Sequence, residues 1–262
     1  MLYQLKTLLI GDTHLMNRLI LPRVSEAILK LQVNRIIMIG DYTDQWGATT
    51  CEHWYKADLR FLYKWKQEMK SQGIEVIMLA GNHDVPYMID KQVYYSVSNL
   101  IAFNWVKEML YDLELQIAYQ LDDFLVSHAG YTEDYRLETW HLNTLTHKHQ
   151  DKLAWLHAHV GLSRSGVYLT GSPIWADLKH DLSKFPHQEY SKQIVGHTPV
   201  EKITTNESII GIDTFSLTTN YRPIGNGDML LYEKGILSVI NNPDWQSEIN
   251  QETIKQCFRK TQ

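Results

Sequence analysis

One pattern recurs along this chain and limits the folds that it can adopt: a short apolar run ends in glycine, and a side chain able to bind metal follows at once. The residues that follow such a run and its glycine are Asp12, Asp41, Asn82 and His197. A fifth run, residues 124–127, leads into His128 without a glycine. Continuous Val, Ile and Leu runs are typical of strands buried on both faces. Glycine after a strand permits a sharp turn and a close approach of the backbone to a ligand.

Helical patterns lie between these runs. Residues 21–31 have apolar spacing close to 3.6 and join the first two runs, and residues 52–71 and 94–115 also have helical character. Alternation of strand and helix is typical of βαβ units in an α/β fold. In such sheets, ligands bind just beyond the carboxyl ends of the strands. We therefore expect the five polar side chains to form one shared site.

The remaining segments predict a single domain over residues 1–262 with one insert. Residues 132–190 have little strand character, and we expect a mostly helical cap there. Short strands return at residues 209–213, 228–232 and 236–240, and the last two are joined by a hairpin turn. The polar tail after Asn242 is expected to be loosely held.

The composition argues against several classes of protein. The net charge is −5 and no block of Lys or Arg occurs, so binding to duplex nucleic acid is not expected. Cys51 and Cys257 lie far apart and form no CxxC pair, which favours a reducing compartment. No apolar run approaches the roughly 18–20 residues of a membrane span, and the first ten residues do not look like a signal peptide. A cytoplasmic enzyme is the expectation.

Five short motifs follow one another along the chain: GDTH at 11–14, GDYTD at 40–44, GNHD at 81–84, SHAG at 127–130 and GHTP at 196–199. This set resembles the calcineurin-like metallophosphoesterases. Within them it is most similar to the branch of serine/threonine protein phosphatases and bacterial diadenosine-tetraphosphate hydrolases. Residues 173–177 and 212–214 are similar to that branch's LLWxD and IDT stretches. The resemblance covers roughly residues 5–240. It implies a four-layer α/β/β/α sandwich with two mixed sheets and a helical cap.

The resemblance also implies a site for two divalent metal ions. The implied ligands are Asp12, His14, Asp41, Asn82, His128 and His197. Asp41 is placed to bridge the ions, for which Mn²⁺ is preferred and Fe, Zn²⁺ and Ni²⁺ are alternatives. Paired metal ions lower the pKa of bound water to about 7 and hold both reacting oxygens of a phosphate. The expected nucleophile is a hydroxide that bridges the metals.

Two more residues are assigned catalytic roles. His83, as an imidazolium, could protonate the leaving alkoxide, and Asp44 would orient it and keep it charged. The alternative is that His83 only supports Asn82, which is also expected to contact the substrate. Asp84 is expected to accept hydrogen bonds or to cap a helix.

The chain departs from the family pattern at two positions. The family's phosphatases carry an arginine directly after the GDxxD motif, where it binds phosphate, but this chain has Gln45 followed by Trp46. Arg164 and Arg222 are the candidates to replace that arginine. Many diesterases of the superfamily have GHxH, but this chain has Pro199 at the second His, which favours the protein-phosphatase branch.

These observations predict a phosphomonoesterase acting on phosphoserine or phosphothreonine in proteins, or on a small phosphorylated molecule. The alternatives are a nucleotide or dinucleoside-polyphosphate hydrolase, or a phosphodiesterase. A binding scaffold without activity is the hypothesis from another class. The presence of all six ligand positions and of His83 argues against it.

Overall fold

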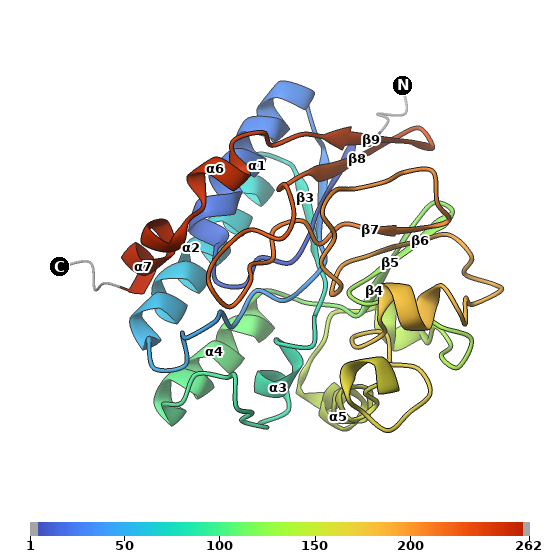
Figure 1. The fold of residues 1–262 in the computed structure, drawn as a ribbon, viewed down its shortest axis with the longest axis horizontal. Helices are drawn as coiled ribbons and strands as arrows, with labels where there is room; N and C mark the ends of the chain where they lie inside the picture. Colours follow the sequence, from blue (N-terminus) through green and yellow to red (C-terminus); the bar gives the residue numbers. More distant parts are fainter. Residues whose placement is uncertain (1–4, 259–262) are drawn as a thin grey trace.

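Two mixed β-sheets lie face to face in the computed structural model, which describes residues 5–258 (Figure 1). The first sheet has the order β3-β2-β1-β8-β9, and the second has the order β4-β5-β6-β7. The strands of the first are β1 (Thr7–Ile10), β2 (Arg35–Met38), β3 (Glu75–Met78), β8 (Met229–Glu233) and β9 (Ile236–Ile240). Those of the second are β4 (Ala118–Leu121), β5 (Phe124–Ser127), β6 (Gln193–Val195) and β7 (Ile209–Gly211).

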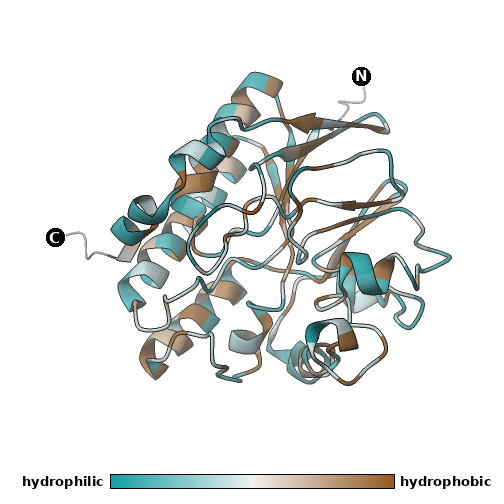
Figure 2. Cartoon of the chain, in the orientation of Figure 1, coloured by the Kyte–Doolittle hydropathy of each residue, from teal (hydrophilic) through white to brown (hydrophobic). Residues whose placement is uncertain are grey.

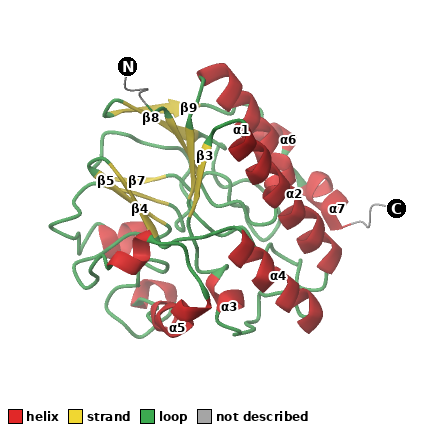
Figure 3. Cartoon of the chain, turned by 180° about the vertical axis from the view of Figure 1, so that it is seen from behind, coloured by secondary structure: helices red, strands yellow, loops and turns green. Residues whose placement is uncertain are grey.

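Strands β1, β2 and β3 run parallel, as do β5, β6 and β7. Helices α1 (Asn17–Leu31) and α2 (Glu52–Ser71) connect the parallel strands of the first sheet. They cover its outer face together with α4 (Leu100–Asp112), as the view from behind shows (Figure 3). Parallel strands joined in this way end at the same edge of their sheet, so the loops that carry the metal-binding motifs converge.

Strand β1 shows how the sequence produces these layers. Leu8 and Ile10 pack into the core beneath the helices, whereas Leu9 packs into the core between the sheets. Successive side chains of a strand point to opposite faces, so a run without polar residues can serve both cores. Figure 2 shows this pattern: the strands are mostly apolar, and the helices beside them mix polar and apolar residues. The two sheets with outer helices confirm the α/β fold predicted from the sequence.

The outer face of the second sheet is covered by the segment predicted to be a helical cap. Tyr135 lies in one apolar cluster with Leu125 of β5, and Leu182 lies in another with Val195 of β6. Within residues 132–190 the one α-helix is α5 (Gln150–Ala158). The short helices there are η1 (Thr139–Leu142), η2 (His147–His149), η3 (Leu162–Arg164) and η4 (Leu178–Leu182). The segment therefore has more loop than its sequence pattern predicted.

The end of the chain also differs from expectation. The tail forms α6 (Trp245–Glu248) and α7 (Gln251–Phe258), and Trp245 is fully buried with its ring 4.9 Å from that of Phe215. The prediction of a loosely held tail was wrong up to the last described residue, and residues 259–262 lie outside the described part. Helix α3 (Val85–Met88) precedes α4, and no helix within residues 5–258 is long and apolar enough to cross a membrane.

Candidate metal centre

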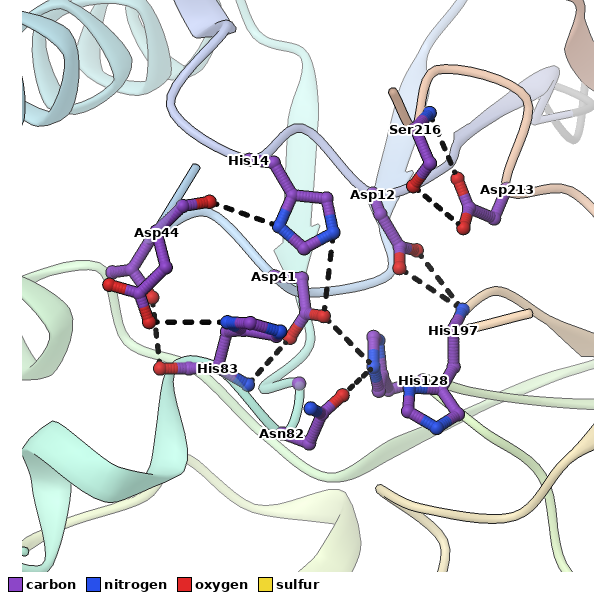
Figure 4. A network of polar contacts seen from close by, with 12 residues as sticks. Asp12, His14, Asp41, Asp44, Asn82, His83, His128, His197, Asp213 and Ser216 are labelled. Carbon is purple, nitrogen blue, oxygen red and sulfur yellow. Dashed lines mark hydrogen bonds and ion pairs between the residues drawn. The ribbon is translucent and has the colours of Figure 1, made fainter. Parts of the chain in front are cut away.

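The loops at the strand ends bring the predicted site residues together (Figure 4). Each loop follows directly on one parallel strand of either sheet. The residues are Asp12 and His14 after β1, Asp41 and Asp44 after β2, Asn82 and His83 after β3, His128 after β5, and His197 after β6. The cluster therefore draws on both sheets, and residues up to 185 positions apart in the sequence are in contact there.

Asp41 lies in the middle of the cluster. Its Oδ2 is 3.8 Å from Nε2 of His14 and 3.5 Å from Nε2 of His128. Two groups of three side chains could each hold a metal ion, because the potential ligand atoms within each group lie within 4.8 Å of one another. The groups are His14–Asp41–His83 and Asp41–His128–His197. Asp41 belongs to both groups, which is the position that a ligand shared by two ions requires.

The donor atoms around His128 fit a cation. Nδ1 of His128 lies 2.9 Å from the carbonyl oxygen of Ile39, so Nδ1 carries the proton and Nε2 presents a lone pair. That lone pair faces the amide oxygen of Asn82 at 3.0 Å. Nε2 of His197 is buried without any hydrogen-bond partner. Three buried lone-pair donors without a proton between them are the arrangement that a bound metal ion satisfies.

Two glycines leave room for carboxylates at this site. A Cβ atom on Gly81 would lie 2.0 Å from Oδ1 of Asp41, and one on Gly196 would lie 2.2 Å from Oδ1 of Asp12. Asp12 in turn accepts the backbone N–H of His197 with both carboxylate oxygens, at 3.3 and 3.1 Å. The glycines that end the apolar runs are therefore required by the close approach of the neighbouring loop.

The backbone of the site is strained. Four of its residues have a left-handed conformation although none of them is glycine. They are His14 (φ 41°), Asp41 (φ 53°), Asp44 (φ 59°) and His197 (φ 61°). Each such residue costs on the order of 1–3 kcal/mol, so the surrounding hydrogen bonds must hold it in place. Strain of this kind collects where side chains must be aimed at one point.

The electrostatics favour a cation. Burial, together with the charges of Asp213 and Asp41, raises the pKa of Asp12 well above its usual value. Burial raises the pKa of Asp213 to about 7 and, with the charge of Asp41, that of Asp84 to about 7 as well. Burial lowers the pKa of His14 to about 4. The crowded carboxylates repel one another, so a cation between them is favoured. The neutral imidazoles present the lone pairs that divalent metals bind.

His83 differs from the other histidines of the cluster. Burial alone would lower its pKa, but the charge of Asp41 and the hydrogen bond with Asp44 outweigh burial and raise the pKa to about 9. Its Nδ1 lies 3.2 Å from Oδ2 of Asp44, and its side chain is 25% exposed. An imidazolium is therefore held by one ring nitrogen, in a position that solvent and ligands can reach.

The side chain of Gln45 is held by two hydrogen bonds to nearby backbone groups. Its Nε2 donates to the carbonyl oxygen of His14 at 3.0 Å, and its Oε1 accepts the N–H of Trp46 at 2.9 Å. Because the side chain is also mostly buried, Gln45 supports the position of His14.

The two candidate arginines lie in different surroundings. Nη2 of Arg164 donates to Oγ1 of Thr198 at 2.8 Å and pairs with Asp177 at 3.0 Å. Its charge acts on His197. Arg222 lies in an exposed loop, where its backbone N–H donates to Oγ1 of Thr218 at 3.1 Å. Arg164 therefore lies beside His197 and Thr198. Within the described residues, the guanidinium of Arg222 forms no hydrogen bond or ion pair with the cluster.

Several residues beside the cluster were not identified from the sequence. Asp213 lies in the 212–214 motif, which had been noted without a role, and it accepts hydrogen bonds from Ser216. The ring of Tyr95 packs 4.4 Å from that of His83, and the ring of Trp175 lies 5.7 Å from that of His197. The short motif of Asp213 was a usable signal, whereas nothing in the sequence marked Tyr95.

Comparisons with known proteins agree with this geometry. Residues 5–201 match the family model of the calcineurin-like phosphoesterases. A cold-active protein-tyrosine phosphatase from a Shewanella species has a similar structure, with 16% identity, a TM-score of 0.55, and coverage of 92% of this chain and 78% of that one. A protein serine/threonine phosphatase from Saccharomyces cerevisiae gives 15% identity, a TM-score of 0.52, and coverage of 91% and 80%. No curated protein matches the sequence.

Proposed function

The chain belongs to the calcineurin-like phosphoesterases, a family of metal-dependent hydrolases, and on that premise we propose that it hydrolyses a phosphomonoester. The substrate is a phosphoserine or phosphothreonine of a protein, or a small phosphorylated molecule. The observation that carries the proposal is the pair of cationic groups at the cluster, namely Arg164 beside His197 and protonated His83 beside Asp41. A phosphate dianion with a basic leaving oxygen needs both a cation to bind it and an acid to complete its cleavage.

The proposed metal ligands are the six residues named from the sequence. Asp12, His14 and Asp41 would hold one ion, and Asp41, Asn82, His128 and His197 would hold the other. Divalent ions bound there would supply a nucleophile at neutral pH and positive charge opposite the phosphate. The nitrogen and oxygen donors suit Mn²⁺, which we prefer, and also Fe, Zn²⁺ and Ni²⁺.

His83 is the proposed general acid. Because its Nδ1 faces the carboxylate of Asp44, Nε2 is the nitrogen that is left to donate a proton to the leaving oxygen. The hydrogen bond with Asp44 favours the protonated form of the ring. Asp44 orients the ring.

Arg164 is proposed to bind the phosphate oxygens in place of the arginine that the family's phosphatases carry at the position of Gln45. It reaches the cluster from η3, and its contacts with Thr198, Asp177 and the carbonyl oxygen of His197 all use Nη2. These contacts leave Nη1 for an anion, whereas Nε is buried. Asn82 is proposed to contact the phosphate as well, and Arg222 stays a prediction from the sequence.

A second candidate function is cleavage of a nucleotide or dinucleoside polyphosphate, or of a phosphodiester. Two aromatic side chains favour it. Tyr95 packs against His83, and Trp46 is 50% exposed with its Nε1 held by the carbonyl oxygen of Leu217. Rings at the edge of the site offer a surface on which a nucleobase can stack.

The test is hydrolysis of p-nitrophenyl phosphate, bis-p-nitrophenyl phosphate and a dinucleoside tetraphosphate, each with Mn²⁺ and with EDTA. Preference for the monoester, lost in EDTA, supports the proposal, and a phosphopeptide panel then follows. Preference for the diester or the dinucleotide replaces the proposal with the second candidate. Purified protein that takes up no divalent metal and cleaves none of the three would identify a binding scaffold.

A further inference from the structure

Both carboxylate oxygens of Asp44 are engaged, and by different partners. Oδ1 accepts the hydroxyl of Tyr55 at 2.7 Å and the hydroxyl of Tyr87 at 2.6 Å. Oδ2 faces Nδ1 of His83 at 3.2 Å. Asp44, Tyr55 and Tyr87 are all buried, so protein groups rather than solvent determine where this carboxylate points.

The two tyrosines come from separate helices. Tyr55 lies in the first turns of α2 and Tyr87 lies in α3, so the carboxylate joins two elements that flank the site. The oxygen of Tyr87 also accepts the backbone N–H of Val97 at 2.8 Å. Because that N–H occupies a lone pair of the hydroxyl oxygen, the hydroxyl proton is directed at Asp44.

Packing alone does not account for these hydroxyls. Phenylalanine would fill nearly the same volume, and a buried tyrosine hydroxyl normally has a hydrogen-bond partner. Here both hydroxyls donate to the same oxygen of the same carboxylate. The pair leaves Oδ2 free for His83 and keeps Asp44 in its left-handed conformation (φ 59°).

We propose that Tyr55 and Tyr87 are positioning residues for His83, which hold Asp44 so that the imidazole presents Nε2 to the leaving oxygen. This inference rests on the proposed function, because it assumes that His83 is the general acid. Within the described residues, the two hydroxyls contact Asp44 and Val97 and none of the proposed metal ligands. Their loss should therefore weaken proton donation and leave the binding of metal and phosphate in place.

The leaving group distinguishes this role from a structural one. p-Nitrophenolate leaves readily without a proton, whereas the alkoxide of glycerol 2-phosphate must be protonated as the bond to phosphorus breaks. A defect in the position of the acid consequently slows the alkyl ester more than the aryl ester. A general loosening of the site slows both substrates equally.

The experiment compares Tyr55→Phe, Tyr87→Phe and the double variant on both substrates, with Mn²⁺-loaded protein. For the double variant we expect kcat on glycerol 2-phosphate to fall about 10- to 100-fold, and kcat on p-nitrophenyl phosphate to fall less than about 3-fold. KM for both substrates and the Mn²⁺ content should be unchanged. Tyr111→Phe is the matched control, because its hydroxyl donates to the carbonyl oxygen of Met88 at the end of α3 and not to Asp44.

Equal losses on the two substrates, or no loss on the alkyl ester, would overturn the inference. If the double variant does not fold, as judged by circular dichroism, the same comparison is made with the two single variants. If the wild-type protein hydrolyses neither monoester, the proposed function is wrong, and the positioning of His83 must be tested without activity. The positioning is then read from the low-field proton NMR signal of His83 Nδ1–H, identified by its absence in His83→Asn. Its persistence in the double variant would overturn the inference, and its loss there but not in Tyr111→Phe would support it.

Discussion

The carboxylate of Asp84 lies behind Asp41 and accepts its backbone N–H at 2.8 Å. The same carboxylate accepts further backbone N–H groups, those of Tyr42, Thr43 and Gly81. Asp84 thereby joins the loop after β2 to the loop after β3. This is the acceptor role predicted for Asp84 from the sequence, and it fixes the strained backbone from which Asp41 projects.

Replacing Asp84 by alanine should therefore destabilise the protein strongly. Four buried N–H groups would lose their acceptor, and each unpaired buried group costs about 1–3 kcal/mol. We expect a loss of at least about 3 kcal/mol in urea unfolding, and weaker binding of both metals. Asp84→Asn, which keeps one acceptor oxygen, should lose less. An alanine variant as stable as wild type would show that the loops are held by other contacts.

Asp41→Asn should lower the affinity for both metal ions, because Asp41 belongs to both groups of potential ligand atoms. An amide has no negative charge, so its oxygen is a weaker ligand for each of two neighbouring cations than the carboxylate is. Metal content by mass spectrometry after dialysis measures the effect. The matched variant is His197→Ala, which should lose one ion. Retention of one tightly bound ion by Asp41→Asn would show that the carboxylate is not shared.

His83→Asn should retain both metals and lose turnover by the roughly 10²–10⁴-fold that general acid catalysis contributes. The physical reason is that asparagine cannot carry a transferable proton. Steady-state kinetics on glycerol 2-phosphate, with metal content determined on the same sample, provide the measurement. Full activity of this variant would remove His83 from the mechanism.

Arg164→Gln should raise KM for a phosphomonoester by about tenfold, which corresponds to a loss of about 1.4 kcal/mol of binding. The amide keeps hydrogen-bonding capacity and removes the charge that acts on His197. Arg222→Gln provides the comparison, since the two arginines are the competing candidates for the phosphate contact. A larger effect at Arg222 would reverse the assignment.

Glu114 should make stability depend on pH in the acid range. Hydrogen bonds from Lys70 and Lys66 lower its pKa to about 2, below the usual value of 4.5. A lowered folded-state pKa stabilises the fold above the unfolded pKa, and this stabilisation is lost as the pH falls from 4.5 through 2. Glu114→Gln should cost about 1 kcal/mol at pH 7, because the side chain is half exposed and its charge is screened by water. The difference from wild type should shrink below pH 4.5 in denaturant titrations; a constant difference would contradict it.

The site was largely predictable from the sequence because its information is local. Each proposed ligand follows an apolar run within four residues, and parallel strands of one sheet end near one another. The contacts of Tyr55 and Tyr87 with Asp44 span 11 and 43 residues, and no short motif encodes them. Asp213 lies in a short motif, but its approach to Asp12 is a long-range contact that the motif does not encode.

The errors about secondary structure have equally specific causes. The helix predicted over residues 94–115 begins only after Asn99, whose side chain accepts the N–H groups of Ile101 and Ala102. A polar residue inside an apolar pattern was thus a helix cap. The tail after Asn242 is polar on average, but Trp245, Ile249 and Ile254 are buried in the core beneath the helices. Averages over a segment do not register a few anchoring side chains.

The division of the ligand cluster between the two sheets has a consequence for the order of events in the cell. Asp12, His14, Asp41 and Asn82 are synthesised first, and His128 and His197 follow much later. At the roughly 5–20 residues per second of translation, several seconds pass before the last of these ligands exists. A nascent chain can therefore bind a metal ion only weakly, through an incomplete set of donors. The proposed metal centre is complete only when both halves of the chain have been made and have packed against each other.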